Sequence, residues 1–167
     1  MPTQETRDFE LYARSRQQQI YRTAYLLCGD TDRAQDLTQT TLAKLFQHWR
    51  KASRATSIDA YAKTVLTRTY LAEERTRSRE DALHTRVAPP TAPDQPDLRV
   101  TLIDALATLT PKSRAVIVLR YWDDLPIDQV AALLDCHPGT VKSSCSRALR
   151  QLRARLGEDV ELYAALV

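Results

Sequence analysis

Glycine is scarce in this sequence. Only Gly29, Gly139 and Gly157 occur among its 167 residues. Glycine-rich turns let backbone amides approach phosphates in dinucleotide-binding and P-loop folds. The scarcity therefore argues against a nucleotide-dependent enzyme, and we expect no cofactor.

Paired metal-binding or catalytic residues are also lacking. The three cysteines form no CxxC pair and have no regular histidine spacing; they are Cys28, Cys136 and Cys145. Neither a zinc site nor a disulfide framework is indicated, and ordinary thiols of a reducing cytoplasm are expected. The histidines His48, His84 and His137 are scattered, and no Ser/His/Asp or Cys/His arrangement is evident. We therefore expect no metal and no enzymatic activity.

Long hydrophobic runs are absent as well. The stretch from Met1 to Leu11 is polar and charged, without an apolar signal core. No run approaches the length that spans a bilayer. The sequence thus predicts a cytoplasmic protein without membrane insertion.

Positive charge, in contrast, is concentrated in two stretches. The net charge is only +3, but residues 50–79 contain eight Lys/Arg and three Asp/Glu. Residues 137–155 contain five basic residues and no acidic one. Two basic surfaces that suit nucleic acid are predicted, although either stretch alone is equally compatible with a solvated helix face.

Apolar residues recur at three- and four-residue spacings, which predicts an all-α fold. A first helix is predicted from about residue 8 to residue 28, where Gly29 ends it. A second follows a cap at Asp30 or Thr31 and runs to about Arg50. A third opens at Thr56, with an acidic residue three positions later, and ends in a basic run at residues 75–79.

Proline divides the chain in two. Four of the eight prolines lie between residues 88 and 97, where little apolar content is available for burial. Proline removes backbone donors and favours extended conformations, so this segment is predicted to be a stiff tether. We expect two small helical domains, residues 1–87 and 98–167, joined by this proline-rich linker at 88–97.

The second domain has the pattern of a helix-turn-helix. A helix that opens at Thr110-Pro111 is expected to reach Trp122, and a short helix at 126–134 precedes a turn at 135–137 and a last basic helix. An apolar face on that last helix is predicted from Val141, Cys145, Ala148 and Leu152. The opposite face suits a major groove, although an ordinary helical hairpin with a solvated basic face is the alternative.

The last helix resembles region four of RNA polymerase sigma factors. The family's GTVKSR…RA signature is similar to PGTVKS at 138–143, followed by Arg147-Ala148. The residues that lead into this motif in the family are similar to YWDDL at 121–125. The chain departs from the pattern at Ser144, Gln129 and Asp135, where arginine, glutamate and glycine are usual. The resemblance implies minus-thirty-five DNA contacts from His137, Gly139, Thr140, Lys142, Ser143, Ser146, Arg147 and Arg150.

The first domain resembles sigma region two. DLTQTTL at residues 36–42 is similar to the family's DLVQEVF core, which binds the coiled coil of the polymerase's largest subunit. The resemblance implies core polymerase contacts from Asp32, Asp36, Gln39 and Leu42. Without it, a solvated acidic helix start that the helix dipole favours would be the better explanation of these side chains.

Residues 61–79 resemble the family's promoter-melting helix, in which bases stack on aromatic rings while cations pair with phosphates. The polar segment Lys51 to Ser57 is similar to the loop that holds a base flipped from the minus-ten strand. The chain departs from the family pattern at Arg68 and Ala72, where asparagine and aspartate are frequent. The implied minus-ten contacts are Arg50, Lys51, Arg54, Tyr61, Lys63, Arg68 and Arg75. Tyr61 and Tyr70 are equally compatible with core positions.

The resemblance covers nearly the whole chain and is closest to the minimal, extracytoplasmic-function (ECF) group. It implies a factor that binds core RNA polymerase, through the largest-subunit coiled coil and the flap, and recognises promoter DNA. An anti-sigma factor is a further implied partner. A stand-alone helix-turn-helix regulator, which would bind paired half-sites as a dimer without polymerase, is the main alternative.

Overall fold

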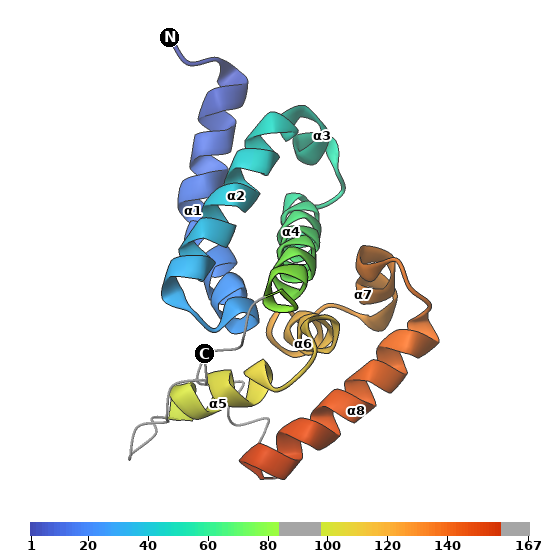
Figure 1. The fold of residues 1–167 in the computed structure, drawn as a ribbon. Helices are drawn as coiled ribbons and strands as arrows, with labels where there is room; N and C mark the ends of the chain where they lie inside the picture. The colour runs from blue at the N-terminus through green and yellow to red at the C-terminus, as the bar shows by residue number, and fades with distance from the viewer. Residues whose placement is uncertain (84–97, 158–167) are drawn as a thin grey trace. The chain divides into compact units, whose positions relative to one another are not determined.

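The computed structural model describes residues 1–83 and 98–157, and every regular element in these two ranges is helical (Figure 1). The predicted all-α class is therefore confirmed. Contacts divide the chain into two compact units, Met1–Tyr70 and Leu71–Val167, at a point inside the helix α4 (Ile58–Asp81). The predicted linker at 88–97 lies outside the described residues, so the domain limits 1–87 and 98–167 stay predictions.

Local capping sets the first two helices, which lie side by side and run in opposite directions (Figure 1). Helix α1 (Gln4–Cys28) ends at Gly29, whose φ of 68° lies in the left-handed region that glycine enters without strain. Helix α2 (Thr31–Gln47) is capped by Asp30, whose Oδ1 accepts a hydrogen bond from the Arg33 N–H at 2.8 Å. The predicted boundary between the two helices is thus confirmed.

Two predictions are wrong here: that the second helix runs to about Arg50, and that a polar loop follows it from Lys51 to Ser57. Helix α2 ends at Gln47, and a separate short helix, α3 (Trp49–Arg54), includes Lys51. Trp49 and Ala52, three residues apart, are 6 % and 0 % exposed. Burial of this side holds the segment helical, which its charge pattern did not indicate, so only residues 55–57 remain as a connection.

The cap of helix α4 was also predicted one residue too early. The Ser57 hydroxyl, rather than Thr56, accepts the hydrogen bond from the Ala60 N–H at 3.1 Å. Farther along α4, Lys44 Nζ on α2 donates to Thr69 Oγ1 at 3.0 Å. These polar contacts supplement a core to which all three long helices contribute, including Ala24, Leu27, Ala34, Leu37, Leu45, Leu66 and Tyr70.

The second unit is arranged around helix α8 (Pro138–Leu156), which packs against α5 (Leu98–Ala107), α6 (Pro111–Ile117) and α7 (Ile127–Leu134). Thr110 caps α6 and proline occupies its first position, as predicted. The helix reaches Trp122, as predicted, but its last part, η1 (Val118–Trp122), is π-helical.

The helix-turn-helix prediction is confirmed by α7, the turn at 135–137 and α8. Its core contains Val116, Leu119, Val130, Ala131, Leu133 and Val141. Asp135 ends α7 with φ 54° and ψ 52°, a left-handed conformation in which glycine is most comfortable and aspartate is tolerated. This geometry gives a physical reason for the glycine that is usual at this position.

Candidate nucleic-acid interface

The start of helix α8 is built by local hydrogen bonding. The Gly139 N–H donates to Nδ1 of His137, the capping residue, at 3.1 Å, and Pro138 fills the first helical position. A Cβ on residue 139 would lie 3.3 Å from the same ring nitrogen. Glycine at this position therefore leaves room for the histidine cap, a local role that sequence analysis did not identify.

Burial of one side of α8 orients the other side outward. Val141, Ala148 and Leu152 are at most 2 % exposed, and Cys145 is half-buried against the same core. The predicted apolar face is therefore confirmed. All eight residues predicted for minus-thirty-five contacts are exposed, namely His137, Gly139, Thr140, Lys142, Ser143, Ser146, Arg147 and Arg150.

The exposed face offers cations and hydroxyl groups without any carboxylate among residues 137–156. The Ser143 hydroxyl donates to the Thr140 carbonyl at 3.1 Å, which leaves its oxygen lone pairs available as acceptors. Arg153 is exposed three residues beyond Arg150 and extends the basic surface by one turn. The sequence-based set omitted Arg153, although its helical spacing could have identified it.

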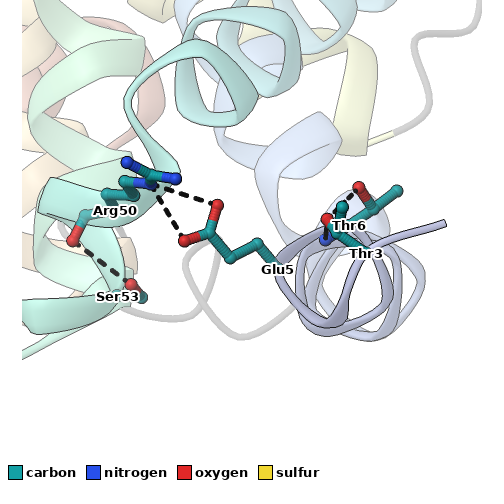
Figure 2. A network of polar contacts seen from close by, with 5 residues as sticks. All are labelled: Thr3, Glu5, Thr6, Arg50 and Ser53. Atoms are coloured by element: carbon teal, nitrogen blue, oxygen red, sulfur yellow. Dashed lines mark hydrogen bonds and ion pairs between the residues drawn. The ribbon is translucent and has the colours of Figure 1, made fainter.

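The predicted minus-ten residues occupy α3 and α4 of the chain. Five of the seven are exposed cations, and the remaining lysine and tyrosine are half-buried. The exposed side chains include Arg50, Lys51, Arg54, Arg68 and Arg75, whereas Tyr61 and Lys63 are half-buried. Arg50 is bound by a carboxylate, because its Nε donates to Glu5 Oε1 at 2.9 Å and to Oε2 at 3.2 Å (Figure 2).

The two tyrosines that the sequence left undecided have different environments. Tyr70 is 0 % exposed and belongs to the core of the first unit. Tyr61 is half-buried. Only Tyr61 therefore remains a candidate for stacking on a base.

A third group of predicted residues lies on α2. Asp32, Asp36 and Gln39 are exposed at spacings of four and three residues, which places them on one side of the helix. Leu42 is only 8 % exposed and belongs to the buried side of the helix, so a polymerase contact of its side chain stays a prediction. The apolar spacing of α2 already indicated burial of this leucine.

Hydrogen bonding joins α1 to the beginning of α4. The Tyr12 hydroxyl donates to Asp59 Oδ1 at 2.8 Å, and Arg16 Nη2 lies 3.3 Å from Asp59 Oδ2. Burial, followed by the hydrogen bond to Asp59, raises the pKa of Tyr12 well above its ordinary value of 10.0. This pair fixes the helix that carries Tyr61 and Lys63.

Other kinds of site find no support in the part of the chain that the structure describes. Within residues 1–83 and 98–157, no three His, Cys, Asp or Glu side chains are grouped so that they could hold a metal ion. None of the helices in these ranges is both long and apolar enough to cross a membrane.

Comparison with known proteins agrees with this arrangement. The sigma-70 region 2 family matches residues 12–80, and the sigma-70 region 4 family matches residues 99–152. The chain is 38 % identical over 156 residues to an RNA polymerase sigma-E factor of Streptomyces coelicolor, covering 91 % of this chain and 88 % of the relative. It is 31 % identical over 147 residues to the ECF sigma factor SigL of Mycobacterium tuberculosis, covering 83 % of each.

A solved structure is similar over almost the same length. It is the sigma factor RpoE of Bartonella quintana in complex with the anti-sigma factor NepR, with a TM-score of 0.72 and 25 % sequence identity. The match covers 91 % of this chain and 98 % of the solved one. Together with the two family matches, these similarities show that the chain belongs to the ECF sigma factors of the sigma-70 family, which bind core RNA polymerase and direct promoter-specific transcription initiation.

Proposed function

We propose that this sigma factor recognises the minus-thirty-five duplex through α8, holds the minus-ten strand with α3 and α4, and docks on polymerase through the acidic side of α2. The observation that carries the proposal is the exposure of all eight predicted residues, one at the cap of α8 and seven along the helix, while Val141, Ala148 and Leu152 are buried. Such a helix fits a major groove, where Lys and Arg donate to guanine edges and hydroxyl groups bind bases or phosphates.

The role proposed for α3 and α4 rests on their mixture of exposed cations with a half-buried tyrosine. Arg54 and Arg68 are exposed, and Tyr61 keeps part of its surface accessible. Single-stranded DNA binds to such surfaces because bases stack on aromatic rings while phosphates pair with cations. Capture of the opened minus-ten strand is the step that this arrangement supports.

The acidic side of α2 supplies the proposed polymerase contact. Asp32 and Asp36 carry exposed carboxylates, and Gln39 adds an exposed amide on the same side. Complementary charge on a partner raises the association rate and sets the docking register. We expect basic side chains of the largest-subunit coiled coil to face these groups.

The factor acts by binding and performs no bond-making chemistry in this proposal. Because the similar RpoE was solved with the anti-sigma factor NepR, we expect an anti-sigma partner for this chain as well. Holoenzyme assembly would hold both DNA-binding surfaces near one promoter, which raises the effective concentration of the second contact. The free chain is therefore expected to bind promoters weakly.

Run-off transcription with purified core polymerase on genomic fragments tests the proposal. Arg147→Ala should weaken transcripts by removing a contact of about 1–3 kcal/mol to DNA, while polymerase binding is retained. Asp36→Ala should weaken polymerase binding itself, measured by co-migration with core enzyme on a native gel. Glu10→Ala, which removes another exposed acid of the first unit, is the matched control.

Two results would contradict the assignment of surfaces. Transcripts that are unaffected by Arg147→Ala would remove α8 from minus-thirty-five recognition. An Asp36→Ala variant that binds polymerase as the wild type does would remove the acidic side of α2 from docking. Tight sequence-specific binding by the free protein would contradict the expectation that polymerase assembly is needed.

A further inference from the structure

An ion pair joins the first turn of α1 to the basic helix α3. Arg50 and Glu5 are 45 residues apart in sequence, yet Arg50 Nε lies 2.9 Å from one Glu5 oxygen and 3.2 Å from the other (Figure 2). Arg50 is one of three exposed cations of α3, with Lys51 and Arg54. Within residues 1–83 and 98–157, only Arg50 of these three has an ion pair.

Aromatic packing holds this part of α1 against α3. Phe9 lies one turn after Glu5, and its ring centroid is 5.0 Å from that of Phe46 and 5.4 Å from that of Trp49. Tyr12 packs 5.6 Å from the same indole. Two residues before Glu5, Thr3 caps the N-terminus of α1, because its hydroxyl oxygen accepts a hydrogen bond from the Thr6 N–H at 3.2 Å (Figure 2). The carboxylate of Glu5 is thus presented to Arg50 by a fixed helix.

The sigma-70 region 2 match covers only one residue of the Arg50–Glu5 pair. The region 2 match begins at residue 12, so it includes Arg50 but does not include Glu5. The carboxylate that meets the cation therefore comes from residues that the family match does not cover.

We propose that Glu5 competes with DNA phosphates for Arg50 and thereby weakens capture of the minus-ten strand. The inference rests on the proposed DNA-binding role of Arg50. A phosphate that approaches this guanidinium must displace the carboxylate or share the cation with it, and the carboxylate repels the phosphate in either case. Strand capture then depends more on the other cations and on Tyr61.

The exposure of the pair sets the size of the effect. The side chains of Arg50 and Glu5 are 78 % and 55 % exposed, so water and salt screen their attraction. Exposed pairs of this kind are worth at most about 1 kcal/mol, which corresponds to a factor of about five in affinity. Glu5 therefore attenuates strand binding and does not abolish it.

The test measures binding of a fluorescent minus-ten non-template oligonucleotide to reconstituted holoenzyme by anisotropy, across a salt series. The oligonucleotide is taken from a promoter that the wild-type protein transcribes. Glu5→Gln should raise affinity about two- to fivefold at low salt and steepen the dependence of log K on log salt by about 0.7. In the Arg50→Ala background, the same change should have no effect. Glu10→Gln removes an equal charge from the same helix and is the control.

Each outcome separates this inference from the function on which it rests. If Arg50→Ala binds the oligonucleotide as the wild type does, the proposed role of Arg50 fails and the inference fails with it. If Arg50→Ala weakens binding but Glu5→Gln does not strengthen it, only the inference is overturned. An equal gain from Glu10→Gln would also overturn it, because the effect would then be one of net charge.

Discussion

Replacing Arg114 with methionine tests how the second unit supports its DNA-binding helix. Arg114 is only 9 % exposed, and its guanidinium joins the end of α5 to the start of α6. Its Nε donates to the Leu106 carbonyl at 2.8 Å, and its Nη2 donates to the carbonyls of Ala107 at 3.2 Å and Leu109 at 2.9 Å. Methionine keeps much of the aliphatic volume while it removes all of these donors.

The magnitude follows from the carbonyl groups that lose their partner. The bond to Leu109 is buried, and an unsatisfied buried acceptor costs about 1–3 kcal/mol. The Leu106 carbonyl also loses the Arg114 donor, but it keeps a hydrogen bond from the Leu109 N–H at 3.1 Å. The bond to Ala107 is only partly buried, so water can replace it. Removal of a buried cation recovers part of its desolvation cost. We expect Arg114→Met to lower the free energy of unfolding of the second unit by roughly 1–3 kcal/mol.

Hydrogen exchange resolved by peptide is the appropriate assay because it reports the two units separately. Amides of α5, α6 and α8 should lose protection, since α5 and α6 both pack on α8, whereas those of α1 and α2 should not. Lys112→Met is the control, because Lys112 is an exposed cation on the same short helix. A loss below about 1 kcal/mol, or one equal to the control, would refute the reasoning.

Three further predictions address the turn, the basic helix and the Tyr12 contact. Asp135→Gly should raise the urea midpoint, because glycine adopts a φ of 54° without strain, and the free energy of unfolding should rise by about 0.5–1 kcal/mol. Asp135→Ala should not raise it. Equal urea midpoints for the glycine variant and the wild type would contradict the prediction. Arg147→Ala should reduce the salt slope of duplex promoter binding by about 0.9, and an unchanged slope would exclude a phosphate contact. Because the pKa of Tyr12 is raised in the folded state, the free energy of unfolding should fall as the pH rises above the ordinary value of 10.0. Tyr12→Phe should flatten that fall. If the free energy of unfolding of the variant depends on alkaline pH as that of the wild type does, Tyr12 is not the group responsible.

Local rules made much of the fold predictable. The end of α1 at Gly29, the cap at Asp30 and the start of α6 at Thr110 follow from backbone and side-chain preferences within a few residues. The outer face of α8 was predictable as well, because apolar residues at helical spacing leave the intervening positions exposed. Motif resemblance then assigned that face to promoter recognition.

Other features depended on segments that are distant in sequence. The helical state of α3 depends on burial of Trp49, and the core position of Tyr70 depends on the helices that surround it. Arg50 carries the same charge as Lys51 in the sequence, but only the packing of α1 brings Glu5 to it. Sequence alone therefore determined the end of α1, the caps of α2 and α6 and the outer face of α8, because these properties are local. Tertiary structure alone decided the helical state of α3, the burial of Tyr70 and the pairing of Arg50 with Glu5, because these depend on contacts between parts of the chain that only folding brings together.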